Sequence, residues 1–191
     1  MSFVKSASLR NQFLIATPTL EDGIFKSSVT YICEHDEDGA MGIIINRPSD
    51  LKFNDLVKEF EAVETSELNT QPVMVGGPVG LERGFVLHQT PENTIEWLST
   101  LQISQDIALT GSKDILTALG EGQGPDKFLF VLGYAGWGAG QLEQELMEND
   151  WLTCPATPEI LFSTPYHLRA EAAAKSLGVD LSALATQPGN A

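Results

Sequence analysis

The sequence predicts an α/β (α+β) fold in a single domain. Short runs rich in β-branched and aromatic residues, such as Ser28–Glu34 and Phe128–Leu132, lie between turn signals, as strands do. Between Phe53 and Phe60, apolar residues instead recur at helical spacing. The 191 residues suit one domain, with room for a smaller subdomain. We therefore expect strands and helices packed around a common core over residues 1–191.

Several other strands are predicted. Ser28–Glu34 and Met41–Asn46 form a predicted hairpin, and its connection, His35–Ala40, is longer than a two-residue turn. Further strands are predicted at Phe13–Ala16, Pro72–Val75, Arg83–Gln89, Ile95–Leu98 and Ile107–Thr110.

Capping residues mark the other helices. Ser112 is the predicted N-cap of Lys113–Leu119, with Gly120 as its left-handed end. Thr164 and Pro165 open a helix that Gly178 closes. Asp180 caps a last turn, and residues 186–191 are expected to fray.

The stretch Phe128–Leu152 organises the chain. Its first five residues predict a buried strand that stops at Gly133. A glycine-rich loop follows around Trp137, and Gln141 then opens a helix that Asn149 stops. The loop glycines are Gly133, Gly136, Gly138 and Gly140. They fit neither G-x-G-x-x-G nor the P-loop, so nucleotide binding is not indicated. The loop either lets backbone amides approach a ligand or allows tight packing around Trp137.

Composition excludes some functions. The formal net charge of −15 repels phosphate backbones and anionic lipid headgroups, so direct nucleic-acid or membrane binding is not expected. The 2 cysteines are too few for a disulfide framework, which fits a reducing compartment. No apolar stretch approaches the roughly 20 residues that span a bilayer, and no signal-peptide core is visible. A cytoplasmic location is therefore predicted.

The segment Cys33, Glu34 and His35 places a thiol, a carboxylate and an imidazole together. In a regular strand Cys33 and His35 face the same side, which would suit a catalytic Cys-His pair or half of a metal site. A structural role is the alternative, because no second ligand pair with zinc-like spacing occurs. A calcium-loop match around Asp36 also fails, since Met41 stands where glycine is required. We expect no metal and no cofactor.

Arg47, beside Asn46 at a strand end, is a candidate anion-binding residue. A guanidinium there could hold a small carboxylate or phosphate, or could pair with an internal Asp or Glu. If the turn Asn46–Pro48 faces the glycine loop, the two segments would line a shallow site for a small anion.

Several long motifs resemble one known family. They are FLIATP at 13–18, SVTYICEHDEDGAMGIIINRP at 28–48, VGGPV at 75–79, RGFVLH at 83–88 and GYAGWGAGQLEQEL at 133–146. Together they resemble the AlgH/YqgE family of bacterial proteins along about the whole chain. The resemblance implies coiled, bifurcated mixed β-sheets with flanking helices in a cytoplasmic protein. It implies no established activity.

Some members of that family carry the name transcriptional regulator of alginate synthesis. This chain has no basic helix pair or basic stripe that could read DNA. We therefore expect an indirect regulatory module that binds a small molecule or a protein. The alternative is an enzyme that acts on a small anionic substrate where the CEH, NRP and GYAGW motifs converge. The oligomeric state is left open.

Overall fold

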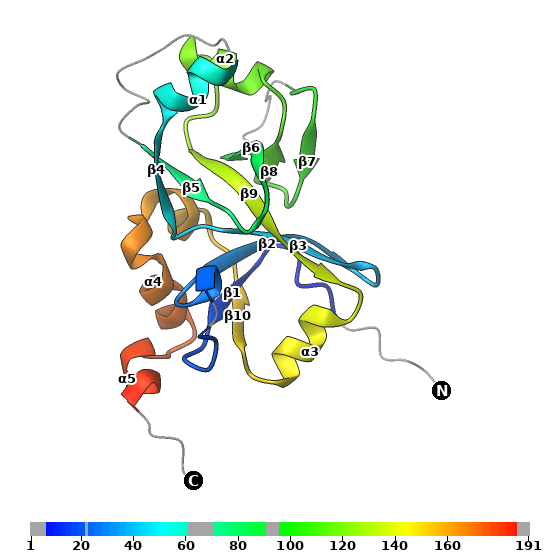
Figure 1. Ribbon diagram of the computed structural model, residues 1–191, viewed down its shortest axis with the longest axis vertical. Helices are drawn as coiled ribbons and strands as arrows, with labels where there is room; N and C mark the ends of the chain where they lie inside the picture. The colour runs from blue at the N-terminus through cyan, green and yellow to red at the C-terminus, as the bar shows by residue number, and fades with distance from the viewer. Residues whose placement is uncertain (1–6, 22, 61–70, 91–95, 187–191) are drawn as a thin grey trace.

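Two curled halves of one sheet share a single long strand. The computed structural model describes residues 7–21, 23–60, 71–90 and 96–186 (Figure 1). The shared strand is β9, Phe128–Gly138, which runs diagonally from the upper half to the lower half of the molecule. Helices flank both halves. The structure confirms the predicted α+β class with a curled, largely antiparallel sheet.

The lower sheet consists of five strands in the order β10-β1-β2-β3-β9. Their bounds are β10 Trp151–Pro155, β1 Gln12–Ala16, β2 Val29–Asp36 and β3 Gly39–Ile44, followed by the second half of β9. Helix α3, Gln141–Met147, packs on one face through Leu142. Helix α4, Arg169–Ser176, packs on the other face through Ala173 and Ala174. Both faces of this sheet are therefore covered by helices.

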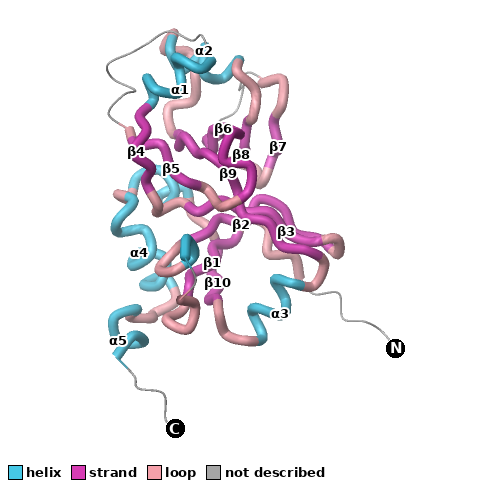
Figure 2. The backbone as a smooth tube through the Cα atoms, viewed as in Figure 1, coloured by secondary structure: helices cyan, strands magenta, loops and turns pink. Residues whose placement is uncertain are grey.

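The upper sheet surrounds the first half of β9. Its strands are β4 Pro48–Lys52, β5 Pro72–Val75, β6 Val79–Gln89, β7 Thr100–Gln102 and β8 Ile107–Thr110. Helices α1, Phe53–Phe60, and α2, Asp114–Gly120, close its top (Figure 2). Phe53 stacks on Phe130 of β9 with ring centroids 4.8 Å apart. Apolar residues of α1, α2, β5, β6 and β9 thus pack together in one cluster.

The chain crosses β9 where the two sheets meet. Both β5 and β6 pair with Val131 and Leu132, so they lie on opposite edges of β9. The three residues 76–78 that link them must pass over the strand. A Cβ at Gly77 would lie 2.1 Å from the carbonyl carbon of Tyr134, and Gly133 has φ +72. Glycine is required at both positions, because one admits no side chain and the other is left-handed.

Most predicted elements are confirmed. The strands at 13–16, 72–75 and 107–110 and the helix at 53–60 lie where the sequence predicts them. The helix expected after Pro165 begins as a 3₁₀ turn, Tyr166–Leu168, and ends before Gly178 at φ +72. Asp180 caps α5, Leu181–Thr186, by accepting a hydrogen bond from the Ser182 amide at 2.9 Å. The rest of the predicted frayed tail, residues 187–191, lies outside the described residues.

The glycine segment is the main correction. The sequence predicts a loop from Gly133 to Gly140, but β9 continues to Gly138. The positive φ of Gly133 bends the strand without ending it, and residues 135–138 then pair with Gly39–Gly42 of β3. Only the turn at residues 139–140 separates the strand from α3, and Gly140 makes that turn with φ +75.

Three local predictions were also wrong. The hairpin between β2 and β3 has a two-residue turn, since Asp36 pairs with Gly39 and the Asp36 carboxylate accepts the Asp38 amide at 2.8 Å. Of the strand expected at 95–98, residue 95 lies outside the described residues and 96–98 form no strand; β7 lies at Thr100–Gln102, and Leu98 is 90% exposed. Ser112 does not cap α2: its hydroxyl bonds the Asp114 carboxylate, and the left-handed residue after that helix is Gly122 rather than Gly120.

The passage of residues 76–78 over β9 predicts that alanine substitutions at two glycines of this region differ in their effect on stability. Gly77→Ala should lower the free energy of unfolding by at least about 2 kcal/mol, because the new Cβ would overlap the Tyr134 backbone. Gly136→Ala is the matched control. Its Cβ would meet nothing nearer than 3.8 Å, so its effect should stay within about 1 kcal/mol. Urea unfolding of both variants measures the difference in free energy of unfolding. Equal losses of stability would contradict the close approach of Gly77 to β9.

Candidate functional site

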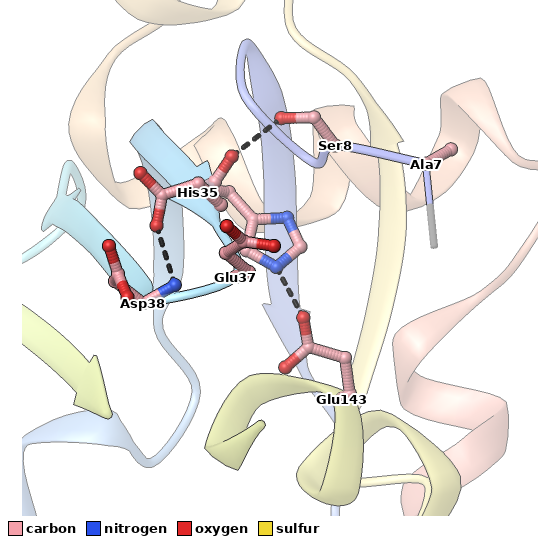
Figure 3. Close-up of a pocket in the computed structure, with 7 residues that line it drawn as sticks. Ala7, Ser8, His35, Glu37, Asp38 and Glu143 are labelled. Atoms are coloured by element: carbon pink, nitrogen blue, oxygen red, sulfur yellow. Dashed lines mark hydrogen bonds and ion pairs between the residues drawn. The ribbon is translucent and has the colours of Figure 1, made fainter. Parts of the chain in front are cut away.

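A cavity opens beside the tip of the β2–β3 hairpin. Its volume is about 650 Å³. Figure 3 shows side chains that line it. The N-terminal segment, the hairpin and α3 each contribute to its lining. The lining residues are Ala7, Ser8, His35, Asp36, Glu37, Asp38 and Glu143. The cavity therefore contains one imidazole and four carboxylates.

His35 is held from both sides. Its Nδ1 accepts a hydrogen bond from the Leu9 amide at 2.8 Å. Because a backbone amide can only donate, Nδ1 carries no proton, and Nε2–H donates to Glu143 Oε1 at 2.5 Å. The His35 side chain is only 3% exposed, and its carbonyl accepts from the Ser8 hydroxyl at 3.0 Å. The ring is thus a neutral imidazole of fixed tautomer that ties the N-terminal segment to α3.

Glu143 supplies negative charge to the cavity. Partial burial raises the pKa of this carboxyl, but hydrogen bonds from its own backbone amide and from His35 outweigh the burial and lower the pKa below its usual value. Asp36, Glu37 and Asp38 add carboxylates around the same space, and the lining that the described part of the chain provides includes no Lys or Arg. The field in this cavity favours cations over anions.

A β-bulge separates His35 from Cys33. The register pairs Ile32 with Gly42 and Glu34 with Met41, so β2 carries one extra residue at this point. The bulge turns His35 toward α3, whereas Cys33 joins the core on the opposite face of the sheet. The prediction that these two side chains share one face is therefore wrong, because strict alternation does not hold across a bulge.

Cys33 has the properties of a core residue. It is 0% exposed, and its thiol contacts the Tyr31 carbonyl at 3.7 Å. Burial, followed by the nearby Glu34 carboxylate, raises the pKa of the Cys33 thiol well above its ordinary value. A buried thiol without thiolate character is a poor nucleophile. Within the described residues, no group of three His, Cys, Asp or Glu side chains is placed to hold a metal.

Trp137 also belongs to the core. It is 6% exposed and packs against Phe25 and Trp151. The indole N–H groups of Trp137 and Trp151 both donate to Glu145 Oε2, at 2.9 and 2.8 Å. Glu145 thus anchors α3 beneath β9, and the Trp137 side chain does not line a surface site.

Asn46 and Arg47 lie at the opposite end of the hairpin from His35. Asn46 accepts the Val29 amide at 2.9 Å and donates to the Ser27 carbonyl at 2.9 Å, while Arg47 donates to the Lys26 carbonyl at 2.9 Å. The register places Ala40 between His35 and Trp137, several residues away from Asn46. The structure thus brings the CEH motif, residues 33–35, close to the end of the GYAGW motif, residues 133–137. The NRP motif, residues 46–48, lies away from both.

Sequence reasoning missed Glu143 and the N-terminal residues Ser8 and Leu9. Glu143 was one of 26 acidic residues, and nothing in its spacing singles it out. It reaches His35 because Ala40 pairs with both His35 and Trp137, which places α3 beneath the hairpin. No local pattern reports such a pairing over more than 100 positions.

Comparison with known proteins identifies the family. The AlgH-like family model matches residues 13–182. The chain belongs to this family. A UPF0301 protein of Methylococcus capsulatus is 50% identical over 95% of this chain and 96% of its own length, and one of Idiomarina loihiensis is 50% identical over 96% and 99%. The resemblance seen in the sequence motifs is thereby confirmed.

Solved structures agree on the fold. The AlgH protein from Pseudomonas aeruginosa superimposes with a TM-score of 0.80 at 45% identity and covers 100% of both chains. Protein DIP2367 from Corynebacterium diphtheriae gives 0.74 at 21% identity, over 98% of this chain and 95% of that one, which bears on the fold alone. No described helix of this AlgH-like protein is long and apolar enough to cross a membrane.

The contact between His35 and Glu143 predicts a pH-dependent stability difference. A carboxyl whose pKa is lowered on folding stabilises the protein above its unfolded-state value of about 4.3, and that contribution is lost as pH falls through the lower folded value. Glu143→Gln should therefore be less stable than the parent near pH 7, by under about 1 kcal/mol since the group is a third exposed.

The difference in stability between Glu143→Gln and the parent should disappear at low pH. Below the folded pKa the parent carboxyl is neutral and resembles the glutamine amide in charge. Denaturant unfolding between about pH 2.5 and 7 is the measurement. Glu121→Gln removes one exposed charge elsewhere and serves as the control. A Glu143→Gln deficit that persists unchanged at the acid end would contradict the assignment.

Proposed function

We propose that this AlgH-like protein is a cytoplasmic binding module that takes a positively charged group in the cavity lined by His35, Glu143 and the hairpin turn. The group would be a small amine or a basic side chain of a protein. The observation that carries the proposal is the composition of the cavity wall, which among the described residues has four carboxylates and no Lys or Arg. Any regulatory effect would pass through this ligand rather than through contact with DNA.

The cavity suits such a ligand in size and chemistry. Its volume of about 650 Å³ lies within the range of small-molecule sites. An ammonium donates three hydrogen bonds, and charge-assisted bonds to carboxylates are the strong ones. His35 is fixed by Leu9 and Glu143, so the wall is organised before any ligand arrives. Preorganisation lowers the entropic cost of binding.

The charge of the chain supports the absence of direct DNA binding. The net charge is −15, and neutralising phosphates requires clustered Lys and Arg. The cavity described above adds to the repulsion instead of opposing it. We therefore propose an indirect role for any member of this architecture that affects transcription.

A small anion near Arg47 is the second candidate. The Nε of Arg47 is buried without a hydrogen-bond partner, although its Nη2 binds the Lys26 carbonyl. Nearby, Arg169 is 5% exposed and donates to the Ile45 carbonyl, and burial lowers its pKa to about 10. Within the described residues neither guanidinium forms an ion pair. If the protein is instead an enzyme that acts on a small anion, Cys33 is not its nucleophile, because that thiol is buried.

Ligand-induced thermal shifts test the proposal. The probes are methylamine, spermidine and the tripeptide Lys-Gly-Lys, with phosphate and citrate as anions of matched concentration, all at about 150 mM salt to screen non-specific attraction. Amines should raise the melting temperature of the parent. The double variant Glu37→Gln and Asp38→Asn should bind them at least about tenfold more weakly, a loss of about 1.4 kcal/mol.

The control has the same charge change at a distant place. Glu121→Gln with Asp126→Asn removes two exposed carboxylates from the loop after α2 and should keep the full amine response. If anions stabilise the parent and amines do not, the Arg47 site becomes the better candidate. If both double variants respond equally to amines, the proposal that amines bind in the cavity is contradicted. Duplex DNA, titrated at the same salt, should show no salt-dependent micromolar binding.

A further inference from the structure

One edge of β9 is free at its second half. On the side of β6, pairing ends with Val79 opposite Tyr134. Beyond this point the chain before Val79 turns away to cross β9 at Gly77. Residues 135–138 pair with Gly39–Gly42 of β3 on their other side, and no second strand of the described residues joins them. The lower sheet therefore ends in an open edge.

The direction of the backbone groups at this edge follows from the ladder. The Ile44 amide donates toward β9, to Gly76, and the Ile45 amide donates toward β2, to Val29. Alternation along β3 then directs Gly42 and Ala40 toward β9, where they pair with Ala135 and Trp137. The intervening residues of β9, Gly136 and Gly138, point their N–H and C=O groups outward.

Gly136 has outward backbone groups that are available for pairing with another strand. The Gly138 amide is already bound by Gln141 Oε1 at 3.0 Å, whereas no hydrogen bond from another described residue reaches the outward groups of Gly136. Gly136 is also exposed. An unpaired N–H and C=O on an exposed edge strand is a template for pairing with another chain.

The chain's own packing does not require glycine at this position. A Cβ at Gly39 would lie 2.2 Å from the Trp137 carbonyl oxygen, and Gly133 is left-handed. At Gly136 the nearest atom would be 3.8 Å away, and at Gly138 4.0 Å, which are ordinary contacts. Neither residue has a positive φ. The missing side chains instead leave a flat surface over which another backbone can approach closely.

Charge indicates the kind of occupant. The strands β2, β3 and β9 carry Glu34 and Asp36 and no Lys or Arg, and the hairpin turn adds Glu37 and Asp38. A second copy of the chain would repeat this excess, because each copy has a net charge of −15. A basic segment is complementary to it. At the end of β6, Val79 and Leu81 are 42% and 52% exposed and offer apolar contact beside the free edge.

We propose that the β9 edge at Gly136 accepts an extended, basic segment of a partner protein as an added strand. The segment lies end to end with β6 and pairs with the outward N–H and C=O of Gly136. Main-chain hydrogen bonds supply affinity in this mode, and Lys or Arg side chains of the segment supply specificity through the acidic hairpin. The backbone groups of Gly136 do not line the cavity at His35, although the carboxylates of the hairpin turn border both sites.

Selection from a displayed library of random ten-residue peptides tests this site. The full chain is the bait, and Gly136→Pro is used for counter-selection. Proline removes the outward N–H and is tolerated at edge positions of this kind. Gly136→Ala retains the N–H and is the matched control. Recovered peptides should be rich in Lys, Arg and strand-forming residues, and should bind the proline variant at least about tenfold more weakly than the alanine variant.

Hydrogen exchange of the parent protein keeps the test independent of how the proline variant folds. A selected peptide should slow exchange of the Gly136 amide and leave the Ala135 and Trp137 amides, already paired with β3, unchanged. Peptides that bind both variants equally, or a selection that yields no sequence dependent on Gly136, would overturn the proposal. So would Gly136 protection that depends on protein concentration without peptide, because a second copy would then occupy the edge.

Discussion

The fold depends on one close approach of two backbones. Residues 76–78 pass over β9 at Gly133 and Tyr134, and no side chain fits at Gly76 or Gly77. This passage lets β5 and β6 flank the same part of β9, so the upper sheet can form. It also frees the second half of β9 to join β3, and a buried strand is thereby shared by two sheets. Glycines occur here because a Cβ at Gly76 or Gly77 would overlap the backbone of β9, and because Gly133 has a positive φ.

The features with functional potential follow from that shared strand. Pairing of Trp137 with Ala40 brings the start of α3 beneath the hairpin, where Glu143 meets His35. Glu145 fixes the helix in this place by accepting two indole N–H groups. The same register leaves Gly136 at an open edge. The acidic cavity and the free edge thus lie on either side of one hairpin, and both depend on where β9 leaves the upper sheet.

The sequence predicts the local elements well and their spatial relations poorly. Strands such as Pro72–Val75 and the helix Phe53–Phe60 follow from periodicity, which is a local property. The sequence predicts a loop at the glycine stretch, because clustered glycines are typical of turns, and the close approach of Gly77 to Tyr134 is not visible in the sequence. The bulge that separates Cys33 from His35 leaves no mark in the sequence. Of the candidate site, His35 could be predicted, and Glu143 could not, since only the tertiary pairing joins them.

Residue-resolved unfolding tests whether β9 couples the two sheets. The amide signals of Phe130, in the upper sheet, and of Ala135, in the lower sheet, can be followed by NMR through a urea titration. Because one strand completes both sheets, the two signals should disappear with the same midpoint and the same slope, as in an all-or-none transition. If the upper-sheet signals are lost at a clearly different urea concentration from the lower-sheet signals, the two halves fold independently, and the crossing at Gly77 does not hold the structure together.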